Sequence, residues 1–465
     1  MPYGGSALEL DSHSRTNIAN LSSDDVEELL EHRPVELRWW LKLVAWESCF
    51  VTMIFCGHLG SLKLAGASIA TVGIQGLAYG IMLGMASAVQ NVCGQAYGAK
   101  KHAAMCITLQ RAFILHFGAA VILTFLYWFS GDFLKVIGQT ESITVQGQVF
   151  AHGLIPQLYA FAFSCPLQRF LQAQNIVYPL AIMGVGVLFL HVRLNWLVVD
   201  ILGYGLLGAA LTLSFSWWIL VFLNVLYIVL SPKCKETWTG FTIKAFVGIW
   251  PYFKAYSCVC FHVVGLVLIS GLLPNPTVAL DSISICMNYL NWDMQVMLGL
   301  GAAASVRVSN ELGAAHPRVA KFSVFVVNGN SMLISVIFAA IILILRVAVS
   351  DLTPLLAISV LLNGIQPILS GVAIGCGWQA LVAYVNLVCY YVIGLTVGCV
   401  LGFKTSLGVA GIWWGMILGV FIQTVALIIL KLGRQRYSKL LVEKTIVRVK
   451  MFAEDDTLDQ PVTDV

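Results

Sequence analysis

Two titratable residues lie inside apolar stretches of the chain, where they could bind and release protons within a membrane. Asp293 occupies the middle of one such stretch, in the segment Tyr289–Gln295, and His262 occupies another. An ionisable side chain at membrane depth costs about 2.5–3.5 kcal/mol on insertion scales and is a functional candidate by default. Histidine also titrates near neutral pH. We expect Asp293 and His262 to be proton-coupling residues, with simple pairing inside a packed bundle as the alternative for each.

Amide and phenol side chains recur among the apolar residues and could hold a small ligand. They are Gln75, Tyr79, Gln295, Asn363, Gln366, Tyr384 and Asn386. A few polar groups among apolar and aromatic surfaces are typical of a pocket for an amphipathic, partly aromatic molecule. Hydrogen bonds between membrane helices, worth about 0.6 kcal/mol a pair, are the alternative for each residue.

Several function classes are excluded by what the sequence does not contain. There is no HExxH, Walker A or GxSxG motif, so we expect no enzyme activity and no nucleotide-driven step. The twelve cysteines form no CxxC pair, and no metal site or other cofactor is expected. The formal net charge of +4 is small and scattered, which argues against a nucleic-acid partner. Any transport is therefore predicted to be driven by an ion gradient.

The composition places these residues in a membrane protein. Hydrophobic residues make up 59% of the chain and charged residues only 11%, with a mean hydropathy of +0.85, whereas soluble proteins carry about 25% charged residues. A spanning helix needs about 20 mostly apolar residues. The apolar stretches predict twelve membrane helices, at residues 41–56, 64–88, 112–130, 148–166, 176–199, 205–230, 255–272, 281–304, 322–346, 353–374, 381–402 and 407–430. The partner is thus a lipid bilayer, and the protein crosses it many times.

The distribution of cations predicts the orientation in the membrane. With both termini in the cytosol, 22 of the 27 lysines and arginines fall on the cytosolic side, as the positive-inside rule requires. The polar N-terminal tail contains an acidic dileucine pattern at Asp25, Leu29 and Leu30, which would suit sorting to a vacuole. A short capped helix explains the same residues equally well.

The chain also contains an internal repeat. Gly84, Gln95 and Gly98 correspond to Gly299, Asn310 and Gly313 at an offset of 215 residues, and the offset falls to about 201 further along. The repeat predicts an all-α protein with two six-helix lobes related by a parallel pseudo-two-fold axis, in which the first helix of each lobe is short. The expected units are a tail (1–38), an N-lobe (39–232), a cytosolic linker (233–254), a C-lobe (255–431) and a second tail (432–465).

Five motifs in this frame resemble those of plant multidrug and toxic compound extrusion (MATE) proteins. They are Cys93–Lys100, Gly153–Gln157, Arg169–Gln174, Arg307–Gly313 and Gly375–Gln379. The resemblance covers about residues 35–430, and the stretches 58–90 and 404–416 are similar to the transparent-testa type. It implies an antiporter that exchanges lumenal protons for flavonoid glycosides at the vacuolar membrane, with the plasma membrane as the second choice, and two lobes that rock around a central cavity.

Three features depart from that family pattern. The first span is short, the loop before Asp351 is short, and span seven has no acid in Cys258–Val264, where family members carry a glutamate implicated in proton coupling. The missing glutamate favours Asp293 as the proton carrier, with His262 as a partial replacement. Two other interpretations stay open: a non-transporting truncated or splice isoform, and an exporter of alkaloids or several drugs. The sequence leaves the exact substrate and the oligomeric state undetermined.

Overall fold

The computed structural model describes residues 47–136, 138, 140–246, 280–314, 316–345, 353–405 and 408–435. Within these ranges the regular secondary structure is helical, without a β-strand. A hydrocarbon environment offers no hydrogen-bond partners, so a membrane-crossing chain must satisfy its backbone internally, as helices do. The predicted all-α class is confirmed.

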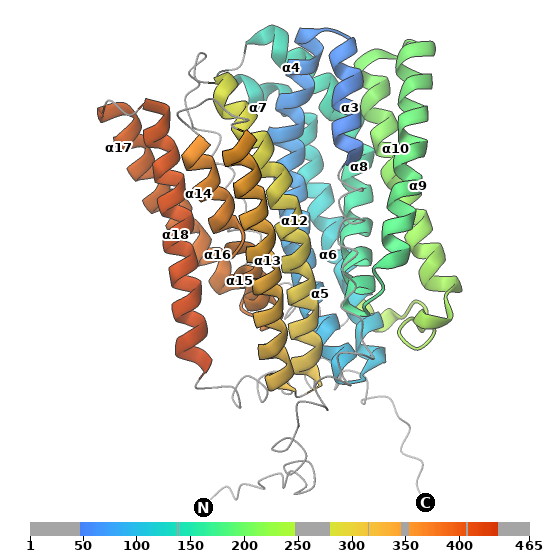
Figure 1. Cartoon of the computed structure of the whole chain (residues 1–465). Coiled ribbons are helices and arrows are strands. Elements are labelled where there is room, and N and C mark those ends of the chain that lie inside the picture. Colours follow the sequence, from blue (N-terminus) through green and yellow to red (C-terminus); the bar gives the residue numbers. More distant parts are fainter. Residues whose placement is uncertain are drawn as a thin grey trace, which may run out of the picture.

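The first half of the described chain forms one group of helices, coloured blue to green in Figure 1. Its elements are α3 (Glu47–His58), α4 (Ser61–Ile69), η2 (Ala70–Gln75), α5 (Gly76–Gly98), α6 (His102–Trp128), α7 (Ser130–Val136), α8 (Glu141–Ala173), α9 (Tyr178–Asn195), η3 (Trp196–Ile201), α10 (Gly205–Leu230), η4 (Pro232–Cys234) and η5 (Ile243–Phe246). The central helix is α8, which packs against α10, α6, α5 and α4. Its fully buried residues Leu154, Leu158 and Phe170 belong to a hydrophobic core that these helices share.

The second half forms a second group, coloured yellow to red, which lies beside the first in Figure 1. Its elements are α12 (Leu280–Gly313), α13 (Pro317–Leu345), α14 (Thr353–Asn363), α15 (Gln366–Gly375), α16 (Gln379–Asn386), η6 (Leu387–Leu395), α17 (Thr396–Lys404) and α18 (Gly408–Gln435). Here α12 packs against α15 and α13 within its own group and against α5 of the first group. The paired helices α5 and α12 therefore join the two lobes.

The helices agree with the predicted membrane spans. Eleven of the twelve predicted stretches overlap described helices, the first of them, 41–56, only from residue 47 on, and the remaining stretch, 255–272, lies outside the described residues. In the described ranges, seven helical segments are long and apolar enough to cross a membrane: Ser61–Gly98, His102–Trp128, Tyr178–Ile201, Gly205–Leu230, Pro317–Ile344, Thr353–Gly375 and Tyr384–Gly402. At 1.5 Å per residue, α8 and α12, with 33 and 34 residues, are also long enough to cross.

The short helix α3 is held in the first lobe by a buried polar cluster. The Thr52 hydroxyl lies 2.9 Å from Nε2 of His191 on α9, and Nδ1 of His191 lies 2.8 Å from the Ser216 hydroxyl on α10. Ser216 donates its own proton to the Thr212 carbonyl, so it accepts from Nδ1–H of His191. All three clustered side chains are buried. The described part of the first helix is thus packed, while the predicted shortness of spans one and seven stays a prediction, because residues 41–46 and 255–272 lie outside the description.

Candidate transport site

The predicted proton-coupling residue Asp293 is buried inside the second lobe. It lies in α12 with only 1% of its surface exposed. Neither carboxyl oxygen makes a hydrogen bond of normal geometry with a described residue. The side chain of Asn363, another predicted site residue, approaches the carboxyl group closely enough to interact with it. The structure therefore brings together two predicted residues that are 70 positions apart in the sequence.

Asn363 stands at a break in a membrane-spanning segment. Helix α14 ends at Asn363, Gly364 and Ile365 form a turn, and α15 begins at Gln366. The second residue of α15 is Pro367, which lacks an N–H and suits the first turn of a helix. The carbonyl of Gly364 accepts a hydrogen bond of 2.5 Å from Ser331 on α13. A backbone polar group freed inside a membrane must find such a partner, so the break is built into the packing.

Broken membrane helices are the usual places where transporters bind ions and substrates near the bilayer midplane. Gln366 is buried at this break and donates to the Ser370 hydroxyl at 3.1 Å, one turn further along α15. Asp293, Asn363 and Gln366 thus place a carboxyl group and two amides around the α14–α15 junction. Of these two amides, the Asn363 side chain is the one that approaches the Asp293 carboxyl group, and the role of Asp293 as proton carrier stays a prediction.

Two further predicted residues lie in the first lobe. Gln75, in the π-helical turn η2, donates to Oε1 of Gln157 on α8 at 2.8 Å. Tyr79, one turn later on α5, packs edge-on against Phe161 at a ring-centroid distance of 5.0 Å, and Phe161 packs edge-on against Trp217 at 4.8 Å. Three aromatic rings and a glutamine pair therefore occupy the middle of the first lobe.

The remaining predicted residues are spread over the molecule. Tyr384 is 52% exposed on α16. Asn386 accepts a hydrogen bond from the buried Gln423 on α18. The backbone of Gln295 belongs to α12, but its side chain is outside the description, as are His262 and the predicted sorting residues Asp25, Leu29 and Leu30. The roles of these residues stay predictions.

An arginine that the sequence analysis named only as the first residue of the motif Arg169–Gln174 lies where the lobes meet. Arg169, on α8, donates from Nη1 to the amide oxygens of Gln90 at 2.7 Å and Gln172 at 3.0 Å. Gln90, on α5, donates in turn to the carbonyl of Ala302 on α12 at 3.1 Å, which crosses from one lobe to the other. The sequence signal was its place in the motif Arg169–Gln174, which follows the predicted span 148–166. Its partners could not be seen because Gln90 is 79 positions away.

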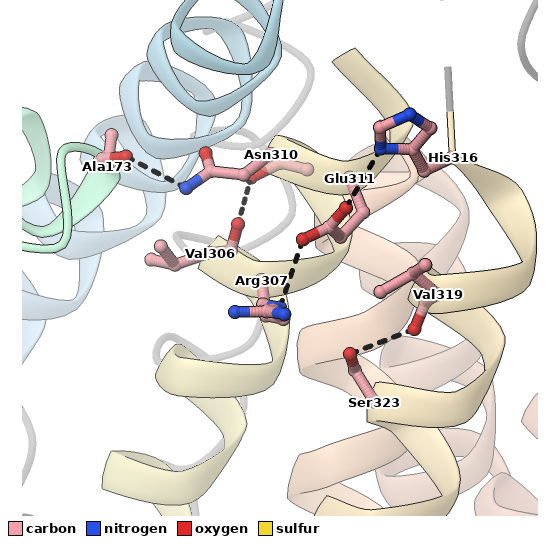
Figure 2. Close-up of polar contacts among 9 residues, drawn as sticks. Ala173, Val306, Arg307, Asn310, Glu311, His316, Val319 and Ser323 are labelled. Atoms are coloured by element: carbon pink, nitrogen blue, oxygen red, sulfur yellow. Dashed lines mark hydrogen bonds and ion pairs between the residues drawn. The ribbon is translucent and has the colours of Figure 1, made fainter. Parts of the chain in front are cut away.

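A second charged group lies at the end of α12 (Figure 2). Nε of Arg307 is 3.1 Å from Oε1 of Glu311, and Nδ1 of His316 is 3.6 Å from Oε2 of the same carboxylate. Both Arg307 and Glu311 are largely buried, with side-chain exposures of 14% and 4%. The neighbouring Asn310 reaches across to α8, where it donates to the carbonyl of Ala173 at 3.1 Å.

Glycines let α5 and α12 approach closely at this same end. A Cβ added to Gly98 would overlap the carbonyl oxygen of Asn310, and one added to Gly313 would overlap that of Gln95. A Cβ at Gly94 would overlap the Ser309 hydroxyl. We call this contact between residues 94–98 and 309–313 the glycine seam. It joins the last residues of α5 to the last residues of α12, at the lower end of these helices in Figure 1.

Comparison with known proteins agrees with this architecture. The MatE family model matches residues 43–197 and 256–400. Protein DETOXIFICATION 41 of Arabidopsis thaliana is 61% identical over 487 aligned positions, which cover 96% of this chain and 96% of that protein. The chain belongs to the MATE family.

Other MATE relatives and structures give the same result. Protein DETOXIFICATION 37 of Arabidopsis thaliana is 46% identical and is covered over 84% of its length, with 87% of this chain aligned. The crystal structure of the eukaryotic MATE transporter AtDTX14 superposes with a TM-score of 0.81 at 32% identity, covering 87% of this chain and 95% of that one. The protein is thus a MATE transporter by family and by fold.

The comparisons also bear on the repeat and on the missing residues. The two matches to the MatE model start at 43 and 256 and end at 197 and 400, so their separation shrinks from 213 to 203 residues, close to the shift seen in the sequence repeat. The alignment with DETOXIFICATION 41 is longer than this chain's 465 residues. That relative therefore has residues at positions where this MATE protein has none.

Proposed function

We propose that this MATE protein is a secondary active antiporter, which moves flavonoid-type organic compounds out of the cytosol in exchange for protons. The observation that supports proton coupling is Asp293, a fully buried carboxyl group beside Asn363 at the break between α14 and α15. Protonation neutralises a carboxylate that is costly to keep charged at membrane depth. Binding and release of the proton would thus change the packing around the broken helix.

Two observations support an amphipathic aromatic substrate. The resemblance to the transparent-testa type implies flavonoid glycosides, whose flat rings and hydroxyl groups match aromatic and amide side chains. The rings of Tyr79, Phe161 and Trp217 and the amides of Gln75 and Gln157 gather in the first lobe, and two of the helices that carry them, α5 and α8, contact α12 of the second lobe. Offset and edge-on aromatic contacts with such a substrate are favourable.

The vacuolar membrane is the proposed location. Its support is the acidic dileucine pattern at Asp25, Leu29 and Leu30. The glycine seam lies at the same end as Lys100, Lys101 and Arg318, so the positive-inside rule assigns that end to the cytosol. The structure then corresponds to a state closed toward the cytosol. Fluorescence imaging of a tagged chain, with and without Leu29→Ala and Leu30→Ala, tests the location.

The test of coupling is uptake of a flavonoid glucoside into vesicles that contain the purified chain, with and without an inside-acid pH gradient. The Asp293→Asn variant removes the titratable group and keeps the shape. It should lose gradient-driven uptake while still exchanging labelled for unlabelled substrate without a gradient. Asp132→Asn, at an exposed site on α7, is the matched control and should behave like the unmodified chain.

Full pH-driven uptake by Asp293→Asn would reject Asp293 as the proton carrier. His262→Gln then becomes the informative variant, because an altered pH profile would assign the role to that residue. Well-inserted protein that moves alkaloids but no flavonoid would overturn the substrate class.

A further inference from the structure

Two glutamine side chains fix the chain that follows α10 to the first lobe. The amide nitrogen of Gln110 on α6 donates to the Gly240 carbonyl at 2.8 Å, and its amide oxygen accepts from the Thr242 backbone N–H at 2.9 Å. The Thr237 hydroxyl donates to the amide oxygen of Gln174, directly after α8, at 2.7 Å. Both glutamines and Thr237 are buried. These contacts hold the backbone after α10 against the ends of α6 and α8.

The residue between the two backbone groups that Gln110 binds is an exposed aromatic. Phe241 is 86% exposed, although the Gly240 and Thr242 backbone groups on either side of it are hydrogen bonded. Gly240 has a φ of 97°, which glycine adopts without steric cost, and the Phe241 ring packs edge-on against Trp238 at 5.3 Å. Phe246, at the end of η5, is 67% exposed. Two phenylalanine side chains therefore point outward from a fixed backbone.

This stretch of chain, residues 231–246, is called the linker segment, and it lies at the depth of a membrane surface. Helix α6 has 27 residues, which gives about 40 Å at 1.5 Å per residue and matches a bilayer with both headgroup regions. Gln110 comes eight residues after His102, the first residue of α6, so the backbone it binds lies about 12 Å inside that end. The headgroups meet the hydrocarbon near this depth. Exposed aromatic side chains at such a level are typical of membrane interfaces.

Cations accompany these aromatic side chains. Four exposed lysines lie in the linker segment or directly before α6: Lys233, Lys235, Lys100 and Lys101. The Glu236 carboxylate is 3.1 Å from Nδ1 of His102, which brings the linker segment next to the start of α6. The positive-inside rule assigns this end to the cytosol. Lipids of the cytosolic leaflet are in part anionic and attract lysines that lie close to the surface.

We propose that the linker segment is a lipid-binding surface for anionic phospholipids of the cytosolic leaflet. The Phe241 and Phe246 side chains enter the interface, and the four lysines contact the headgroups. Because Gln110 already holds the backbone on both sides of Phe241, little conformational entropy is lost when lipid binds. Attachment here keeps the cytosolic rim of the first lobe at the membrane surface. The inference does not depend on the substrate or on proton coupling.

The experiment identifies the lipid that contacts position 241 in the full chain. The photoreactive amino acid p-benzoylphenylalanine replaces Phe241, and the purified chain is placed in nanodiscs of phosphatidylcholine mixed with phosphatidylserine. Lipid adducts are measured by mass spectrometry after illumination. Phosphatidylserine should exceed its share of the bilayer about fivefold among the adducts, which corresponds to about 1 kcal/mol. The same replacement at Phe215, 57% exposed in the middle of α10, is the matched control and should give adducts in the ratio of the bilayer.

A charge variant tests the role of the lysines. Replacing all four by glutamine (Lys100→Gln, Lys101→Gln, Lys233→Gln and Lys235→Gln) should bring the adducts at position 241 to the ratio of the bilayer. Lys135→Gln, on α7, changes a lysine whose side chain is 50% exposed and should leave the enrichment unchanged. A melting temperature equal to that of the unmodified chain shows that each variant is folded.

Three results would overturn the proposal: adducts at position 241 in the ratio of the bilayer, cross-links from that position to protein alone, or full enrichment in the four-lysine variant. The proposed function can fail separately. If the chain shows no proton-driven uptake and phosphatidylserine is still enriched at position 241, the lipid surface is supported and the transport proposal is rejected. Proton-driven uptake without enrichment rejects the lipid surface alone.

Discussion

Helices α5 and α12 occupy equivalent places in the two lobes but carry different chemistry. Both use small residues at their ends to form the glycine seam, Gly94 and Gly98 on one side and Gly313 on the other. Near that seam α5 carries only neutral amides, among them Asn91 and Gln95, which hydrogen bond to each other at 2.9 Å. The corresponding end of α12 carries the buried ion pair of Arg307 and Glu311, and its middle carries Asp293.

This difference indicates a division of labour on a common framework. The repeat preserves the residues that let the two helices touch, because both lobes need the same close approach to close the molecule. It does not preserve the titratable residues, which fits the proposal that Asp293 in the second lobe carries the proton. In the proposed function the first lobe supplies aromatic rings and amides for the substrate, and the second lobe supplies the acid for the proton.

Both α5 and α12 contribute to the glycine seam, and disrupting this contact should have the largest effect on uptake. In Gly98→Ala the new Cβ meets the Asn310 carbonyl on α12, which belongs to the backbone and cannot rotate away. The seam would not close, and we expect uptake to fall more than about tenfold while the protein still inserts. Gly118→Ala on α6, where a Cβ meets nothing within 4 Å, should keep full uptake. Uptake into vesicles and accessibility of a cysteine introduced near the seam measure both properties.

Normal uptake by Gly98→Ala would show that α5 and α12 do not need this contact during transport. Increased accessibility without loss of uptake would assign the seam to stability alone. Gly313→Ala provides an independent repeat of the experiment from the other lobe, because its Cβ meets the Gln95 carbonyl of α5.

The charged end of α12 is where the lobes differ, and its removal should have the next largest effect. Glu311→Gln leaves Arg307 buried without an anionic partner, and breaking a buried pair in this way costs about 3–5 kcal/mol. We expect a clear fall in melting temperature in detergent. The surface pair of Lys135 and Glu141, with side-chain exposures of 50% and 80%, provides the control, since Glu141→Gln should cost less than about 1 kcal/mol.

The double variant Arg307→Met with Glu311→Leu removes both charges and should recover most of the lost stability, because well-packed apolar residues often replace a buried pair without penalty. If the double variant is as unstable as Glu311→Gln, the pair is required for reasons other than charge balance. Equal melting temperatures for Glu311→Gln and Glu141→Gln would show that the buried pair is solvated.

Much of the fold could be predicted because hydrophobic length and cation placement are local properties of the sequence. Eleven predicted spans overlap described helices for that reason. The break at Gly364 and Ile365 was not predicted, although Gly364 and Pro367 signal it, because the residues around it are apolar enough to read as one span. Hydropathy reports how favourably side chains transfer into lipid, and it carries no information about where a helix ends and the next one begins.

The site was harder to predict because its contacts join distant parts of the chain. Asp293 and Asn363 were each selected on their own, and only the packing of α12 against α14 and α15 brings them together. Arg169 was named only as the first residue of the motif Arg169–Gln174. Its significance depends on Gln90 and Ala302, which reach it only when α5, α8 and α12 are assembled.

Substitutions in the pair of Gln75 and Gln157 should have the smallest effect. They test whether the substrate groups lie in the first lobe and the proton group in the second. A hydrogen bond between membrane helices is worth about 0.6 kcal/mol, so Gln75→Leu and Gln157→Leu should each lower the melting temperature slightly. If the pair serves packing alone, the double variant should recover stability and keep the KM of the flavonoid glucoside. If Gln75 binds substrate, the KM of the flavonoid glucoside should rise in Gln75→Leu and stay raised in the double variant.

The pair of Asn386 and Gln423 in the second lobe is the matched control. Asn386→Leu should alter the stability of the protein without altering the KM of the glucoside, since the substrate groups are proposed to lie in the first lobe. A raised KM in Asn386→Leu would instead place part of the substrate against the second lobe and reject the separation of substrate and proton chemistry.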